Sequence, residues 1–229
     1  MVVAVFPAVA AAVVEVVGGN SMTQHIYSRR PSGSSAIPNI IFGLLIANGL
    51  IFALQQFQPG LMLRWFALWP VQTPLFMPWQ VATYGFMHAT GSITHILFNM
   101  WMLWMFGREL EQIMGARRFL AYYMVCVVGA ALVQLLVGAL TGGGAPTVGA
   151  SGGVFGILLA FGMAFPNRML MLIFPPIPMR AKYFVVMLGL FELYLGFSGS
   201  APGIANFAHL GGMLFGFLLL RYWQRQRRR

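Results

Sequence analysis

Charged residues are scarce in this chain. Only 8% of its 229 residues are Asp, Glu, Lys or Arg, whereas 59% are hydrophobic. Soluble globular domains carry about 25% charged residues. A water-facing surface cannot be covered at this composition, so a soluble globular domain is excluded and an integral membrane protein is indicated.

Acidic residues and cysteine are the scarcest reactive groups. Four acidic residues stand against fourteen basic ones, which gives a net charge of +10, and Cys126 is the one cysteine. A single cysteine excludes an intrachain disulfide, and its apolar surroundings disfavour the reactive thiolate. His and Cys do not occur at zinc-binding spacing. We therefore predict no metal site and expect no cofactor.

Six stretches of sequence are apolar enough to be predicted as membrane-spanning helices. They cover residues 38–56, 92–114, 119–140, 151–165, 183–197 and 205–220, and turn-rich breaks separate them. The predicted fold is an all-α polytopic membrane protein, a six-transmembrane-helix bundle over residues 38–220. An N-terminal segment, 1–37, precedes the bundle and a basic tail, 221–229, follows it.

The basic residues lie on one side of these predicted spans. With the spans taken in order, 13 of the 14 Lys and Arg residues fall on the same side, and only Arg64 falls on the other. Basic loops stay in the cytoplasm, so both termini are predicted to be cytoplasmic. The positive charge then orients the protein beside membrane lipids, and we expect no nucleic-acid partner. Compact size and the lack of an organelle-targeting pattern favour the inner (cytoplasmic) membrane of a bacterium.

Two segments do not fit the scheme of six spans. Residues 1–21 are apolar but contain Pro7 and Glu15. They are an extra span, a surface segment or sequence upstream of a true start at Met22, and we favour the last two. Residues 57–91 are rich in aromatic side chains and interrupted by prolines. Such a segment is expected to lie in the lipid headgroup region, which aromatic rings favour.

Polar side chains interrupt the even-numbered spans at one depth. The charge pattern makes the second, fourth and sixth spans begin at the outer face. Their first turns contain His95 and Asn99, Ser151, and His209 respectively. Polar groups inside a bilayer are unfavourable and usually functional. Their coincidence on three helices therefore predicts a functional site.

The fourth span is short, which affects the position of Ser151. Its 15 residues extend about 22 Å, whereas the hydrocarbon layer is about 30 Å thick. Ser151 is thus expected below the outer interface, at a helix N-terminus whose backbone N–H groups face any anion placed there.

Glycine spacing predicts that the helices carrying Ser151 and His209 pack closely. Gly152 and Gly156 form one G-x-x-x-G pattern, and Gly212 and Gly216 form another. Small residues at this spacing let helix backbones approach. His209 would then come within hydrogen-bond distance of Ser151 and act as the general base that a serine nucleophile requires.

Three motifs in these spans resemble those of the rhomboid intramembrane serine proteases. They are Gly149-Ala150-Ser151-Gly152, Ala208-His209 followed by Gly212 and Gly216, and His95-x-x-x-Asn99. The likeness runs over residues 38–220. It implies a rhomboid-like bundle with an interfacial first loop. The implied activity is a serine endopeptidase that cleaves transmembrane protein substrates near the outer face, using a Ser–His dyad without an acid.

The resemblance also implies a role for each site residue. Ser151 is the nucleophile and His209 the base, while His95, Asn99 and the Ser151 backbone N–H form the oxyanion hole. Phe155 packs against the catalytic histidine, and Gly149, Gly152 and Gly212 support the site. Trp79-Gln80 departs from the Trp-Arg pair frequent in the family's first loop, which bears on the anchoring of that loop rather than on the chemistry.

Glu192 interrupts the fifth span at a depth similar to that of the dyad. An intramembrane carboxylate is a functional candidate. It would orient His209 as a third triad member or mark an ion path. The family pattern has no such acid, so we expect a gate or helix-end role.

Two other functions are open at this point. One is a non-catalytic rhomboid-like protein that binds and routes membrane proteins. The other is a proton-coupled transporter that uses Glu192 and His209 as a relay. The transporter would predict inverted repeats and broken helices at mid-membrane, and the sequence has neither.

Overall fold

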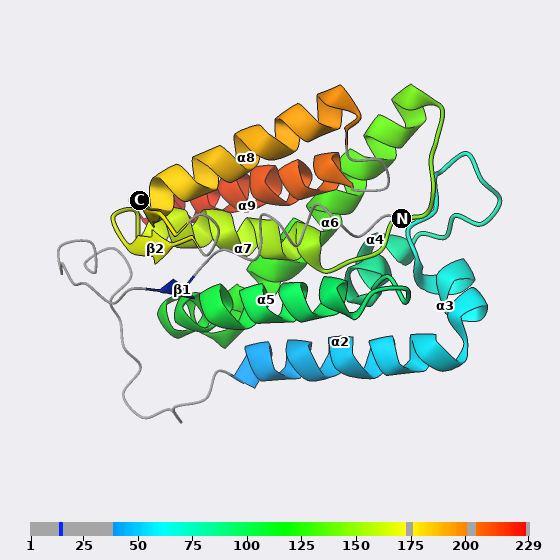
Figure 1. The fold of residues 1–229 in the computed structure, drawn as a ribbon, viewed down its shortest axis with the longest axis horizontal. Helices are drawn as coiled ribbons and strands as arrows, with labels where there is room; N and C mark the ends of the chain where they lie inside the picture. The colour runs from blue at the N-terminus through cyan, green and yellow to red at the C-terminus, as the bar shows by residue number, and fades with distance from the viewer. Residues whose placement is uncertain (1–13, 16–38, 173–175, 201–204, 228–229) are drawn as a thin grey trace.

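The computed structural model describes residues 14–15, 39–172, 176–200 and 205–227, and most of them are helical (Figure 1). The long helices in this part of the chain are α2 (Asn39–Phe57), α5 (Ile93–Met114), α6 (Ala116–Thr141), α7 (Ser151–Ala164), α8 (Ala181–Ser198) and α9 (Asn206–Arg227). Each coincides closely with one predicted apolar stretch. Helix α9 continues through Arg227, so the predicted basic tail is largely helical.

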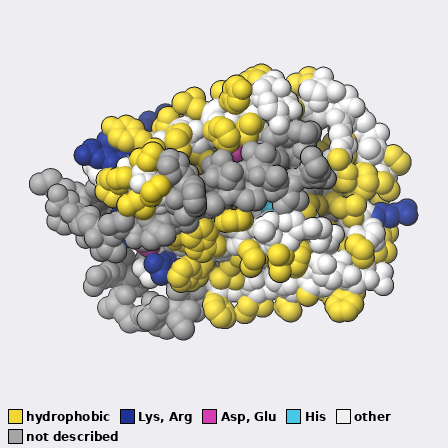
Figure 2. All heavy atoms as spheres, viewed as in Figure 1, with side chains coloured by type: hydrophobic (Ala, Val, Ile, Leu, Met, Phe, Trp, Pro, Cys, Tyr) yellow, Lys and Arg dark blue, Asp and Glu magenta, His cyan; other side chains and the backbone are white. Residues whose placement is uncertain are grey.

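Three helices have the length and hydropathy of a membrane span. They cover Ile40–Phe57, Ala116–Thr141 and Ala181–Ser198, and the helix Ser151–Ala164 is apolar but shorter. In the face shown in Figure 2, hydrophobic side chains cover the flanks, while Lys and Arg side chains gather mainly toward the left end of the long axis. The mainly helical, apolar fold confirms the all-α membrane class, and the crossing of all six helices stays a prediction.

Helix α7 lies at the centre of the bundle. It packs against α5, α6, α8 and α9, and nearly all of its residues are buried, from Ser151 onward. A helix that is apolar on all sides is buried in a protein core or in a membrane, and here the neighbouring helices bury it. The first residue of α7 is therefore held inside the bundle.

The glycine faces of α7 and α9 meet directly. A side-chain carbon added to Gly212 would fall on the carbonyl oxygen of Gly152, and one added to Gly156 would lie 3.2 Å from the carbonyl oxygen of Gly212. Only hydrogen atoms fit between the two backbones at Gly152 and Gly212. The close helix approach predicted from the G-x-x-x-G patterns is confirmed.

The segment between α2 and α5 contains short helices. These are α3 (Pro59–Phe66), α4 (Gln80–Thr83) and the 3₁₀ helix η2 (Tyr84–Phe86). The exposed rings of Trp65 and Trp79 stack with their centroids 6.4 Å apart. Exposed, paired indoles suit a segment at a membrane interface.

Gln80 anchors this segment from within. Its side chain is fully buried. The side-chain oxygen accepts the Trp69 backbone N–H at 3.2 Å, and the amide nitrogen donates to the carbonyl oxygens of Leu75 at 3.0 Å and Arg64 at 3.4 Å. The glutamine that replaces the family's frequent arginine thus ties three points of the loop together.

We expect Gln80→Leu to lower the free energy of unfolding by about 2 kcal/mol, because it leaves these backbone groups without their partner at nearly constant volume. The measurement is chemical unfolding of the purified protein in micelles. Gln56→Leu is the matched control, since Gln56 is exposed and bonds only within its own helix. Equal stability of the two variants would contradict the anchoring role.

A small antiparallel sheet closes the end of the bundle near the C-terminus of α7. Its order is β1 (Val14–Glu15), β2 (Met169–Met171) and β3 (Pro178–Arg180). Of residues 1–21, only 14–15 are described. The alternatives for the rest of that segment, including a start at Met22, lie outside the described residues.

Two of the four acidic residues have structural partners near the C-terminal end of α5. Glu111 accepts the backbone N–H groups of Ile40 at 3.0 Å and Ile41 at 2.9 Å, at the N-terminus of α2. These N–H groups have no partner within their own helix. Glu109 forms a two-pronged ion pair with Arg168, with N–O distances of 3.1 and 3.2 Å. Both carboxylates hold elements together.

Candidate active site

Ser151 and His209 face each other across the contact between α7 and α9. Ser151 is the first residue of α7, and His209 lies in the first turn of α9. The Ser151 Oγ and His209 Nε2 atoms are 2.8 Å apart, and both residues are buried. That distance is within hydrogen-bond range, as the glycine spacing predicts.

Phe155 fixes the plane of the His209 ring. The two rings stack with centroids 4.2 Å apart and an interplanar angle of 4°. Phe155 follows Ser151 by four residues, so both lie on one face of α7. One edge of the imidazole is thereby directed at Ser151, and this contact matches what the family resemblance implies for Phe155.

Glu192 lies against the other nitrogen of His209. Its Oε2 atom is 3.0 Å from Nδ1, and both side chains are buried. From the sequence, a third triad member and an ion path were open and a gate or helix-end role was expected. The structure places the carboxylate at His209, and the role itself stays a prediction. The signal in the sequence was the carboxylate itself, since an ionisable group in an apolar span requires a partner.

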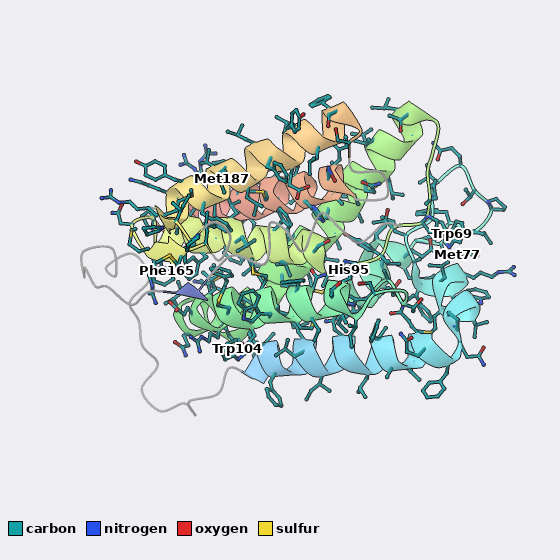
Figure 3. The ribbon with its side chains drawn as sticks, in the orientation of Figure 1. Trp69, Met77, His95, Trp104, Phe165 and Met187 are labelled. Atoms are coloured by element: carbon teal, nitrogen blue, oxygen red, sulfur yellow. The ribbon has the colours of Figure 1, made fainter. Side chains whose placement is uncertain are left out.

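His95 reaches the serine beside Gly149. Its Nδ1 accepts the Ala89 backbone N–H at 3.3 Å, so the hydrogen of the neutral ring is on Nε2. A side-chain carbon at Gly149 would lie 3.2 Å from His95 Nε2 and 3.4 Å from Ser151 Oγ. The donor and the hydroxyl therefore flank one glycine. Figure 3 shows His95 at the end of α5 beside the start of α7.

Gly149 must be glycine for two reasons. Its φ of +137° lies in a region that other residues rarely adopt. Any side chain would also occupy the space between His95 and Ser151. The glycine thus lets the chain turn into α7 while the serine remains next to an imidazole donor.

Asn99 is fully buried on α5, and one of the two N–H donors of its amide is engaged within the helix. The amide nitrogen donates to the His95 carbonyl oxygen at 2.8 Å within the same helix. Of the side-chain donors predicted for an oxyanion hole, the structure brings His95 to the serine. The second N–H of the Asn99 amide is not used by this bond, so the oxyanion role of Asn99 stays a prediction.

The first loop holds the chain that leads into Ser151. Leu68 and Thr147 form an antiparallel bridge with two 2.9 Å hydrogen bonds. The Gly149 N–H donates to the Tyr84 carbonyl oxygen at 3.0 Å. Sequence reasoning missed both contacts, because the partners are more than sixty residues apart and carry no local signal.

His88 supports His95 from behind. Its backbone N–H donates to the Gln55 side-chain oxygen at 2.9 Å, and its carbonyl accepts the Gln55 amide at 2.8 Å. The His88 and His95 rings meet edge to face with centroids 5.3 Å apart. Burial, together with His95, lowers the pKa of His88 to about 3. The ring is therefore neutral at pH 7 and packs as an apolar group.

The described residues were also compared with the ligand sets that metal ions require. In the described ranges, no group of three or more His, Cys, Asp and Glu residues is placed to hold a metal ion. A hydroxyl, an imidazole and a carboxylate in sequence, beside a second imidazole donor, form the constellation of serine hydrolases.

A family model described as the Rhomboid domain matches residues 75–226. The chain therefore belongs to the rhomboid family, as its motifs led us to expect. It is 29% identical over 189 residues to the human presenilin-associated rhomboid-like protein, mitochondrial, with 80% of this chain and 48% of that protein covered. The mitochondrial Rhomboid protein 1 of Saccharomyces cerevisiae is 28% identical over 203 residues, with 83% and 56% covered.

A bacterial relative matches over a shorter stretch. The rhomboid protease GluP of Bacillus subtilis is 29% identical over 140 residues, with 61% of this chain and 25% of that protein covered. The chain spans about half the length of the mitochondrial relatives.

These relatives correct the predicted compartment. The sequence alone led us to the inner (cytoplasmic) membrane of a bacterium, but the relatives that match most of the chain are named as mitochondrial proteins. That assignment is wrong. Compact size and a missing targeting pattern are not physical properties of one membrane, so they do not distinguish between compartments.

Proposed function

We propose that this protein is an intramembrane serine endopeptidase that cleaves transmembrane proteins with Ser151 and His209. The observation that supports the proposal is the 2.8 Å separation of Ser151 Oγ and His209 Nε2 inside an apolar helix bundle. A serine hydroxyl becomes a nucleophile when an adjacent base takes its proton, and this pair has the required distance.

The reaction begins when Ser151 Oγ attacks the carbonyl carbon of the scissile peptide and its proton moves to His209 Nε2. The oxyanion that forms accepts hydrogen bonds from His95 Nε2–H and from the Ser151 backbone N–H. Each such donor contributes about 3 kcal/mol to transition-state stabilisation in well-studied hydrolases. His209 then gives the proton to the leaving amine, and water releases the acyl group by the reverse sequence.

The proposed setting is a bilayer crossed by all six long helices. Helix α7 has 14 residues and extends about 21 Å, which is shorter than a hydrocarbon layer of about 30 Å. Ser151 would then lie below the membrane surface, with the first loop at the interface above it. Lipids would contact the exposed apolar faces of α2 and α8, and the substrates would be membrane-embedded proteins.

The test is labelling of the purified, membrane-reconstituted protein with a fluorescent fluorophosphonate, which reacts only with activated serines. We expect labelling of the wild type and of Ser198→Ala, a matched serine control near the end of α8, and none of Ser151→Ala. An unlabelled wild type, beside a membrane serine protease labelled in the same experiment, would defeat the proposal.

One observation favours a second candidate, the proton-coupled transporter. The 3.0 Å contact between Glu192 and His209 would suit a proton relay in a membrane. Proton-driven uptake into liposomes that is lost in Glu192→Gln and retained in Ser151→Ala would select this function. Binding of membrane proteins without any cleavage would instead select the non-catalytic binder.

A further inference from the structure

Glu192 needs an explanation that the dyad does not supply. It is 4% exposed, on a helix with the length and hydropathy of a membrane span. A buried carboxylate in such a helix is unfavourable unless a partner compensates its charge. Its neighbour is His209 Nδ1 on the adjoining helix α9, at 3.0 Å.

The ring geometry places the serine and the carboxylate on the two nitrogens of one imidazole. Phe155 stacks on the ring face, Ser151 Oγ lies at Nε2, and Glu192 Oε2 lies at Nδ1. Three helices, α7, α8 and α9, thus contribute one group each to a continuous path from hydroxyl to carboxylate.

We propose that Glu192 is a positioning residue that completes a Ser151–His209–Glu192 triad. The inference rests on the proposed function. The carboxylate keeps the hydrogen of neutral His209 on Nδ1, so that Nε2 has a free lone pair for the Ser151 proton. When that proton arrives, Glu192 stabilises the imidazolium and remains ionised, and Nε2 alone passes the proton to the leaving amine.

The contact between Glu192 and His209 shortens as positive charge develops on the imidazole. In the free protein the two atoms are close but not aligned as a hydrogen bond. Catalytic contacts are often loose in the free enzyme and align in the reacting complex. A positive charge on His209 supplies the attraction that draws the carboxylate into line.

The surroundings of His209 single out Glu192 among the acids. The other acidic side chains that the structure describes are engaged elsewhere, Glu109 by Arg168 and Glu111 by the start of α2. From α5, His95 is the titratable group that acts on His209. The titratable side chains of α6 nearest to α9 are Tyr122 and Cys126. They lie beside Gly216, two turns beyond His209.

The experiment compares Glu192→Gln, Glu192→Asp and the wild type in liposomes, with a fluorescent single-span substrate. Glu192→Gln removes the charge at nearly constant shape. We expect kcat to fall about 10⁴-fold with KM unchanged, because Glu192 does not touch substrate and the loss should resemble that of the acid in soluble triads. Glu192→Asp, which keeps a carboxylate, should recover at least a tenth of the wild-type kcat.

The pH profile separates positioning from a structural role. Glu192→Gln removes the charge beside the proposed base, so the acidic limb of kcat/KM should move to lower pH in this variant. Glu109→Gln removes the same charge far from the site and should leave the limb in place. If the acidic limb of the Glu192→Gln profile lies at the same pH as that of the wild type, the triad is wrong. This holds whether kcat is unchanged or falls together with Tm.

The two proposals fail differently. If the wild type cleaves, Ser151→Ala does not, and Glu192→Gln behaves as the wild type in both kcat and pH profile, the triad is wrong and the serine protease stands. If the wild type neither cleaves nor reacts with fluorophosphonate, the proposed function is wrong, and the triad falls with it.

Discussion

Ser151→Ala is expected to reduce cleavage of a single-span substrate by about 10⁴-fold or more, to below detection, and His209→Ala to have a nearly equal effect. Alanine at 151 removes the attacking oxygen, and alanine at 209 removes the group that takes its proton across 2.8 Å. Neither change alters the helix backbones, so both variants should keep the wild-type unfolding transition. The measurement is product formation in proteoliposomes under single-turnover conditions.

The double variant Ser151→Ala/His209→Ala sharpens this prediction. Groups that act as one unit lose their effect together, so the double variant should be no slower than either single variant. Losses that multiply would mean that the two residues contribute independently. Normal cleavage by Ser151→Ala would exclude the proposed nucleophile.

Gly212→Ala is expected to lower the free energy of unfolding by about 3 kcal/mol and to reduce cleavage by about 10²-fold. The added carbon would fall on the backbone carbonyl of Gly152. A backbone carbonyl within a helix cannot rotate out of the way as a flexible side chain can. Helices α7 and α9 must separate, which moves Ser151 away from His209. Chemical unfolding and cleavage kinetics measure the two effects.

Gly49→Ala is the matched control, because an added carbon at Gly49 on α2 meets no atom within 4 Å. It should be neutral or stabilising by about 0.5–1 kcal/mol, as expected for an exposed helix position. If Gly212→Ala were as stable and active as Gly49→Ala, the close glycine contact would not be what positions the dyad.

The helices could be predicted from the sequence because their signals are local. Apolar length marks each helix, and glycine and proline mark the breaks, so the predicted stretch 92–114 and the helix Ile93–Met114 nearly coincide. The motifs around Ser151 and His209 likewise combine residue type with short spacing, which an α-helix converts directly into a shared face. The pairing of α7 with α9 followed from their glycines for the same reason.

The contacts of Gln80 and Asn99 could not be predicted in the same way. At Gln80 the resemblance drew attention to a missing arginine, whereas the fold uses the glutamine amide to bind three backbone groups. For Asn99, the resemblance implied a donor to the oxyanion, and it gave no sign that one hydrogen of the amide nitrogen bonds to the His95 carbonyl. Side-chain amides rotate to whichever partner the surrounding fold supplies, so residue type alone does not select one.

The sequence by itself determined the membrane class, the helices and the candidates for nucleophile and base, because hydropathy and short-range spacing carry that information. Only the tertiary structure decided that Glu192 meets His209, that His95 and Ser151 flank Gly149, and that the first loop holds the chain before Ser151. A helix that is apolar on all sides, such as α7, has no amphipathic stripe to reveal its rotation. Which polar groups meet is then set by the packing of whole helices, through contacts between residues far apart in the chain.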